Sequence, residues 1–311
     1  MRVYVNFRPV RGPYGGANAF LRALTAELRR LGVRVVRDPR KRFDVALLNA
    51  LTLHIDTEFV ARIAETGVPI VHRKVGYRAS GPPEMRALRE DGAVRGDVLQ
   101  LEFTPYLAHS IFQSAYSRDV FVAAGFVGPS SVVHNGVDES IFNQRRRVAW
   151  DGREPMRVAV STWSTDMLKG FEDYARIDAE LDGRRDVVVT LYGRMRDDVR
   201  FRNIREGGAH RRKPLARRLR SAHALLQLAR WETCSNALLE GINCGLPAIF
   251  LDSGSNKEIA AEYGVEFHGS FDTALDELSG RYAELQARTR TNPYRISTVA
   301  RRYVEILESV R

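Results

Sequence analysis

The chain has 311 residues, 44% hydrophobic and 28% charged, which is typical of a soluble globular protein long enough for two domains. No apolar run approaches the roughly 18 residues that a membrane span needs, and the N-terminus leads straight into a strand pattern without a signal-peptide core, so we expect a cytoplasmic protein. The formal net charge of +10 favours anionic partners.

The first half of the chain alternates predicted strands and helices. Val3–Val5 is a short strand, and a turn containing Gly15 and Gly16 leads into an amphipathic helix from Ala19 to Leu31. Such a turn presents backbone N–H groups to a phosphate, although a plain tight turn fits the same residues. Further strands are expected at 33–36, 45–48, 68–71, 109–114 and 131–133, and helices at 57–65, over most of 84–108, and from 115 to about 124.

Polar residues follow the predicted strand 68–71. Ligands of open α/β sheets bind at the carboxyl ends of strands, so His72 is a site candidate, with a structural histidine as the alternative. Ser80–Pro83 reads as an ordered break or a mobile loop.

The alternation restarts in the second half. Strands are expected at 157–160, 187–192, 224–229, 248–251 and 265–267, and helices at 171–181, 214–221, 256–263, 270–289 and 296–311. Two successive βα arrays without hairpin signals predict two doubly wound, Rossmann-like α/β domains facing a central cleft. The predicted boundaries are 1–142 for the first domain, 143–156 for a linker, 157–290 for the second domain, and 291–311 for a terminal helix.

The basic excess is greatest between Arg194 and Arg220, where eleven basic residues stand against three acidic ones. This stretch suits phosphates, anionic lipid headgroups or nucleic acid, and a solvated Arg-rich surface fits it equally well. We expect no nucleic-acid partner, because the stretch lacks interleaved aromatic residues and any recognisable binding module.

Residues 231–247 carry the strongest chemical signal. Glu232 and Glu240 bracket the start of a short helix that Gly245 and Pro247 end, directly after an apolar strand. A helix start beside the carboxyl end of a strand is a place where anionic ligands bind. The two cysteines, Cys234 and Cys244, are expected to be packing residues, since they are too few for a disulfide framework and no Cys/His set has zinc spacing.

Five landmarks together resemble glycosyltransferase family 4, the retaining enzymes of GT-B fold. In chain order they are Gly15-Gly16, Gln113-Ser114, His134-Asn135-Gly136-Val137-Asp138 with Phe142, Lys169-Gly170, and Glu232…Glu240 with Gly245-Leu246-Pro247. The resemblance implies transfer of a sugar from a nucleotide-diphosphate donor, with retention at the anomeric carbon and no cofactor besides this substrate. It also implies that the last helix crosses back onto the first domain.

The resemblance also implies roles for individual residues. Glu232 would hold the hydroxyls of the donor sugar, and Glu240 those of the ribose. Lys169 and the N-terminus of the helix would neutralise the diphosphate, and His72 would orient the sugar or stabilise an oxocarbenium-like transition state. The donor-binding residues would be Gly15, Gly16, Ser164, Arg194, Thr233, Ser235, Asn236 and Glu240. No Asp-x-Asp motif occurs, so we expect no metal, with basic residues in place of Mg²⁺.

One position departs from the family pattern. The family usually has an arginine six residues before the lysine of Lys-Gly, and here that residue is Trp163, whose indole cannot neutralise phosphate. Three alternatives would account for the missing arginine: Arg194 or another basic residue replaces it, Ser164 and backbone donors suffice to bind the diphosphate, or activity is weak. Trp163 itself could instead simply be a core residue. This departure also motivates an alternative function, a non-catalytic GT-B scaffold that binds a nucleotide sugar.

The acceptor would bind the first domain. The charges of Arg73, Lys74 and Arg78 indicate an anionic or membrane-associated acceptor, and with it a peripheral location at the inner membrane face. A solvated rim explains these three residues equally well.

Overall fold

The computed structural model describes residues 1–7, 15–49, 57–76 and 91–311, and these form two compact units. The first unit comprises Met1–Val10, Asn18–Gly136 and Ile296–Arg311, and the second comprises Arg11–Ala17 and Val137–Arg295. The predicted break at Ser80–Pro83, Arg78, the turn residues before Gly15 and the first part of the predicted helical region 84–108 lie outside the described residues.

The first unit contains a six-stranded parallel sheet in the order β2-β1-β3-β4-β5-β6. Its strands are β1 (Arg2–Val5), β2 (Arg34–Val36), β3 (Val45–Asn49), β4 (Ile70–Arg73), β5 (His109–Phe112) and β6 (Ser130–Val132). Its helices are α1 (Gly15–Arg30, whose first three residues group with the second unit), α2 (Thr57–Glu65), α4 (Asp91–Glu102), α5 (Ala115–Ala123) and α12 (Ile296–Ser309).

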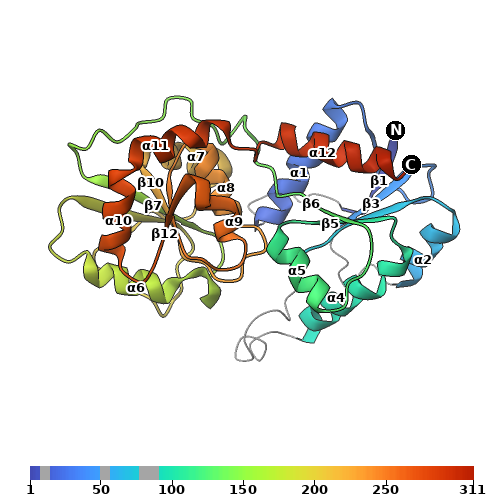
Figure 1. Ribbon diagram of the computed structural model, residues 1–311, viewed down its shortest axis with the longest axis horizontal. Helices are drawn as coiled ribbons and strands as arrows, with labels where there is room; N and C mark the ends of the chain where they lie inside the picture. The colour runs from blue at the N-terminus through green and yellow to red at the C-terminus, as the bar shows by residue number, and fades with distance from the viewer. Residues whose placement is uncertain (8–14, 50–56, 77–90) are drawn as a thin grey trace. The chain divides into compact units, whose positions relative to one another are not determined.

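Alternate residues of these strands enter different hydrophobic clusters on the two faces of the sheet. Val45 and Leu47 pack with α1 and α12, which lie side by side (Figure 1), whereas Ala46 and Leu48 pack with α2. Because side chains alternate along a strand, a strand covered on both faces is buried throughout, as β3 is.

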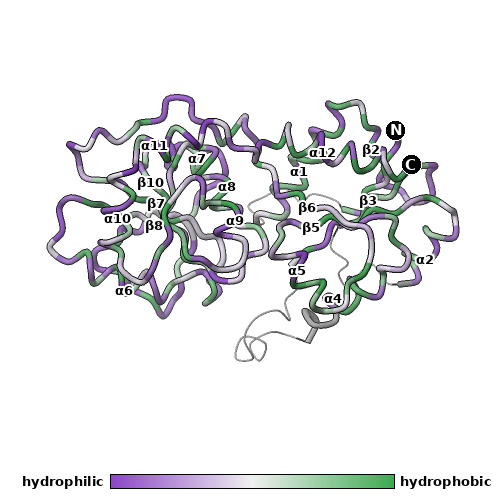
Figure 2. Tube along the Cα trace, viewed as in Figure 1, coloured by the Kyte–Doolittle hydropathy of each residue, from purple (hydrophilic) through white to green (hydrophobic). Residues whose placement is uncertain are grey.

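The second unit repeats this architecture with the strand order β12-β11-β10-β7-β8-β9, again all parallel. Its strands are β7 (Met156–Thr162), β8 (Val187–Gly193), β9 (Arg205–Glu206), β10 (Ala224–Gln227), β11 (Ala248–Phe250) and β12 (Gly264–Glu266). Its helices are α6 (Phe171–Glu180), α7 (Arg212–Ser221), α8 (Asn236–Asn243), α9 (Asn256–Ala260), α10 (Phe271–Gly280) and α11 (Tyr282–Arg288). Hydrophobic residues concentrate on the strands, and the outer loops are mostly hydrophilic (Figure 2).

The prediction of two doubly wound α/β units is confirmed, with differences in detail. β9 was not predicted, because its two residues are exposed and carry no hydrophobic pattern. The helix predicted over 270–289 is two helices, α10 and α11, separated at Arg281, and the helix predicted over 256–263 is α9 followed by a 3₁₀ turn.

The chain passes between the units at Gly136–Val137 and returns at Arg295–Ile296, so 137–142 also belongs to the second unit. The two crossing segments lie side by side, because Val137 N–H donates to the carbonyl of Tyr294 at 2.8 Å. Within the first unit, a Cβ on Gly136 would lie 2.8 Å from Cα of Ile296, so a side chain there would collide with the start of α12.

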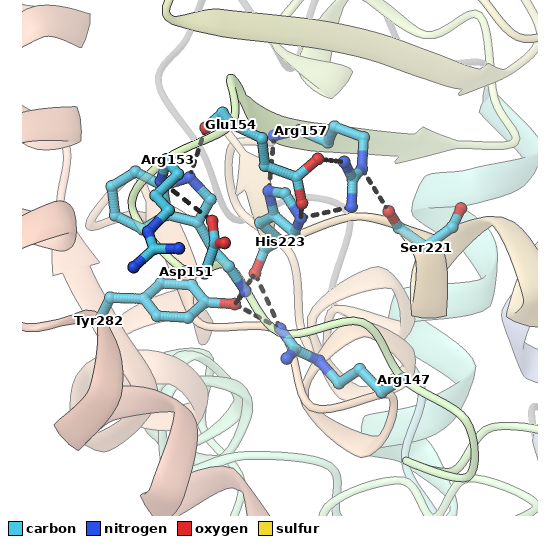
Figure 3. Close-up of polar contacts among 9 residues, drawn as sticks. Arg147, Asp151, Arg153, Glu154, Arg157, Ser221, His223 and Tyr282 are labelled. Atoms are coloured by element: carbon cyan, nitrogen blue, oxygen red, sulfur yellow. Dashed lines mark hydrogen bonds and ion pairs between the residues drawn. The ribbon is translucent and has the colours of Figure 1, made fainter.

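The stretch expected as a linker, residues 143–156, packs on the second unit instead of spanning between the two. The guanidinium of Arg147 donates to the Tyr282 hydroxyl and to the carbonyl of His223, both at 3.0 Å (Figure 3). Trp150 packs edge-on against the Tyr282 ring, with the ring centroids 5.5 Å apart.

Burial and the nearby Arg157 guanidinium lower the pKa of His223 to about 4, so the imidazole of His223 is neutral.

Candidate active site

The loop between β10 and α8 presents Glu232 at the carboxyl edge of the second sheet. The residue before it, Trp231, has φ of 51°, a left-handed conformation that is costly for a bulky side chain. Two contacts hold this turn: Trp231 N–H donates to Ser253 Oγ at 2.9 Å, and the Glu232 carbonyl accepts from Ser255 N at 2.8 Å. Gly254 packs so closely that a Cβ there would lie 2.4 Å from the Glu232 carbonyl oxygen. The loop is therefore held rigidly in a strained shape, as ligand sites often are.

Lys169 forms an ion pair with Glu232, which joins two of the three residues predicted to act in catalysis. The two side chains are 27% and 21% exposed, so the pair is reachable from solvent. Lys169 ends a 3₁₀ turn, Met167–Lys169, which Asp166 caps by accepting from Leu168 N at 2.9 Å. The loop after β7 is tied to the loop after β10 by Arg230 N–H, which donates to the Leu168 carbonyl at 2.8 Å.

Glu240 lies one turn into α8 and is half-buried. No hydrogen bond or ion pair to its carboxylate occurs among the described residues. Burial raises its pKa to about 7, and the charge of Arg212 opposes this increase. Arg212 is itself placed by two landmark residues: it pairs with Asp138 at 3.4 Å and lies over the Phe142 ring at 5.6 Å.

The remaining predicted residues of this motif have different environments. Ser235 is 1% exposed, and its hydroxyl caps α8 by accepting from Leu238 N at 3.4 Å while also accepting from Gln227 Nε2 at 2.7 Å. Its hydroxyl oxygen thus accepts two hydrogen bonds within the fold, and its role in donor binding stays a prediction. Thr233 and Asn236 are half-buried at the start of the helix. Cys234 and Cys244 are buried free thiols.

Trp163 and Arg194 are brought together by strand pairing. The last residues of β7 and β8, Thr162 and Gly193, are partners in the sheet, so the residues that follow them, Trp163 and Arg194, are neighbours. The guanidinium carbon of Arg194 lies 4.7 Å from the centroid of the Trp163 ring, within the range of a cation–π contact. Ser164, next to Trp163, accepts from Asp166 N through its hydroxyl at 3.1 Å.

Gly15 and Gly16 begin α1 and group with the second unit, whereas His72 lies in β4 of the first unit with no exposed surface. Among the described residues, neither ring nitrogen of His72 has a hydrogen-bond partner. Burial, together with the charges of Lys74 and Arg73, keeps its pKa well below the ordinary range, so the imidazole is neutral.

Arg73 and Lys74 are 1% and 0% exposed, so the interpretation of these two as a solvated rim is wrong. The Arg73 guanidinium donates to three carboxamide oxygens, those of Asn49 and Gln113 at 2.7 Å and of Asn135 at 2.5 Å. No site role was predicted for these amides, although each closes or follows a strand of the sheet. That position after an apolar run was the signal that could have found them.

Among residues 1–7, 15–49, 57–76 and 91–311, no three His, Cys, Asp or Glu side chains gather as they would around a metal ion. Within the same ranges, none of the helices has both the length and the apolar character needed to cross a membrane.

No protein-family model matches the sequence, and no curated protein matches it. Solved structures do match over nearly the whole chain. AviGT4, a glycosyltransferase involved in avilamycin A biosynthesis, is 16% identical with a TM-score of 0.63, covering 100% of this chain and 98% of its own. Sucrose-phosphate synthase from Thermosynechococcus elongatus is 12% identical with a TM-score of 0.71, and a glycosyltransferase from Rickettsia africae ESF-5 is 10% identical with a TM-score of 0.67; each comparison covers 99% of this chain and 98% of the other. The protein has the GT-B fold that the resemblance implied.

Proposed function

We propose that the protein is a retaining glycosyltransferase that moves a sugar from a nucleotide-diphosphate donor to an acceptor hydroxyl. The observation that carries the proposal is the contact between Lys169 and Glu232 at the carboxyl edge of the second sheet. Residues far apart in the chain supply one cation and one carboxylate there, and ligands of such sheets bind at this edge. The GT-B fold shared with solved glycosyltransferases supports the same function.

The chemistry follows from the charges. A diphosphate carries more negative charge than a carboxylate, so it competes with Glu232 for the Lys169 ammonium and frees Glu232 to accept hydroxyls of the donor sugar. As the anomeric C–O bond breaks, its electron pair goes to the departing phosphate, where Lys169 and the N-terminus of α8 stabilise the charge. The acceptor hydroxyl forms the new bond on the same face, and its proton goes to the departing phosphate oxygen.

Further parts of this proposal concern Glu240 and His72. Glu240 accepts the ribose hydroxyls, and Arg212 favours the ionised form that does so. In the first unit, His72 orients the sugar or stabilises the oxocarbenium-like transition state; its ring has no exposed surface in this structure, so this role requires the residues that cover it to move. Basic side chains take the place of a metal ion, so activity should persist in a chelator.

The test is release of nucleoside diphosphate from a panel of nucleotide sugars. We expect Lys169→Ala and Glu232→Ala each to lower kcat/KM by on the order of 100-fold or more, as removal of a group that stabilises transition-state charge does. Lys257→Ala is the matched control, because Lys257 is an ion-paired lysine on the surface of the same unit. Full activity in both site variants would refute the assignment, and donor binding without turnover would favour the non-catalytic scaffold.

The acceptor and the location form a separate proposal. We propose an anionic or membrane-associated acceptor on the basis of the net charge of +10, because Arg73 and Lys74 are 1% and 0% exposed and their side chains do not reach an acceptor in this structure. The matching location is cytoplasmic, with peripheral attachment at the inner membrane face. Fractionation of cells, with and without a high-salt wash, would test this, and recovery outside the cytoplasmic side would contradict it.

A further inference from the structure

Arg194 differs from the other cations that follow strands at the carboxyl edge of the second sheet. Lys169 pairs with Glu232, Arg196 with Asp198, and Arg230 with Asp173. Arg194 is exposed, and no carboxylate of the described residues pairs with it.

The partner of Arg194 is an aromatic ring. Its guanidinium lies 4.7 Å from the centroid of Trp163. A cation–π contact holds a guanidinium through its charge and leaves N–H donors free, whereas an ion pair would use them. Arg194 therefore keeps both its charge and its hydrogen-bonding capacity for another anion.

The backbone fixes where this cation stands. A Cβ on Gly193 would lie 1.6 Å from the Thr162 carbonyl oxygen, so only glycine allows the ends of β7 and β8 to come this close. Arg194 N–H also donates to that carbonyl at 3.3 Å. The pairing of β7 with β8, the close approach at Gly193 and the Trp163 ring therefore all determine where the Arg194 guanidinium lies, beside the loop that leads to Lys169.

We propose that Arg194, held in place by Trp163, binds the diphosphate of the donor together with Lys169. Trp163 is then a positioning residue: it does not touch phosphate, and it keeps the guanidinium in a binding geometry. The inference rests on the proposed function, because it identifies a residue of the donor site, and the ligand class is a nucleoside diphosphate.

Titration calorimetry with UDP, GDP and ADP, and with the corresponding nucleosides, tests the proposal. We expect Arg194→Ala to weaken binding of the preferred diphosphate by on the order of 10- to 100-fold, as loss of a hydrogen bond to a charged group does, and to leave nucleoside binding unchanged. Arg196→Ala is the matched control: it removes the same charge two residues away, from an arginine already paired with Asp198, and should change affinity less than about 2-fold.

A double-mutant cycle separates positioning from packing. Trp163→Ala should weaken diphosphate binding by about 3- to 5-fold, the size of an exposed cation–π contact, and Trp163→Phe should weaken it less. In the Arg194→Ala background, Trp163→Ala should have no further effect. Equal losses in both backgrounds, or unchanged diphosphate affinity in Arg194→Ala, would overturn the inference while the proposed function stands. Wild-type protein that binds none of the three diphosphates would overturn both.

Discussion

Glu240→Gln should make the second unit more stable at alkaline pH, and the gain should disappear in acid. Burial raises the pKa of the Glu240 carboxyl from its ordinary value of 4.5 to about 7. The fold therefore favours the protonated form. The stability that this preference contributes is fully present below pH 4.5 and is lost as the pH rises through 7, where the folded protein must hold a buried carboxylate.

The interval between 4.5 and about 7 corresponds to about 3 kcal/mol, at about 1.36 kcal/mol per pH unit. The side chain keeps some contact with water, and solvent screening lowers this figure, so we expect an effect of about 2 kcal/mol. The glutamine is neutral at every pH. Relative to wild type, the free energy of unfolding of Glu240→Gln should increase by about 2 kcal/mol between pH 5 and pH 8.

Tryptophan fluorescence during urea unfolding measures this quantity for the second unit alone, because Trp150, Trp163 and Trp231 are the three tryptophans of the chain and all belong to that unit. Glu277→Gln removes a surface carboxylate of the same unit, paired with Arg281, and should change stability by less than about 0.5 kcal/mol. A difference between Glu240→Gln and wild type that stays constant from pH 5 to pH 8 would refute the reasoning.

Three further predictions concern stability. Lys74 is buried, which lowers its pKa to about 7, so the free energy of unfolding of the wild type should fall as the pH drops from 10 to 7. Lys74→Met should increase the free energy of unfolding, followed by circular dichroism, by on the order of 2 kcal/mol at pH 7 and by less at pH 10. An equal increase at both pH values would contradict this. Gly193→Ala should cost more than about 2 kcal/mol, because its Cβ would lie 1.6 Å from a backbone oxygen, whereas Gly280→Ala, which meets nothing within 4 Å, should cost less than about 1 kcal/mol in the same urea titration. Tyr282→Phe removes the hydroxyl that Arg147 contacts at 3.0 Å, and we expect a loss of about 1–3 kcal/mol by tryptophan fluorescence; wild-type stability would show that the contact is dispensable.

Most of the fold could be predicted because strands covered by helices on both faces read as apolar runs. Val45–Asn49 and Ala224–Gln227 are examples, and both are buried at every residue. The strand Arg205–Glu206 could not be predicted, since it is held by backbone pairing to β8 and its side chains are exposed. The packing of residues 143–156 on the second unit could not be predicted either, because it depends on contacts with Tyr282 and His223, which are remote in sequence.

The candidate site was predictable where a local pattern accompanied the chemistry. Lys169-Gly170 after one strand and Glu232 after another marked residues that the structure brings into contact. Ser235 carried the same kind of signal, and its buried hydroxyl serves as a helix cap. Residue type and spacing thus identify candidates, and the surroundings decide whether a polar atom is left for a ligand.

The sequence by itself determined the two βα arrays, the position of the helix that begins after Glu232, and the presence of an indole at 163. Only the tertiary structure decided that Trp163 holds Arg194, that Arg73 lies buried among carboxamides, and that Glu240 has a raised pKa. The physical reason is the sequence separation between the residues that interact. Periodicity, turns and caps act between residues a few positions apart, whereas burial, charge pairing and strand register join residues from different elements, 31 positions apart for Trp163 and Arg194 and 63 for Lys169 and Glu232.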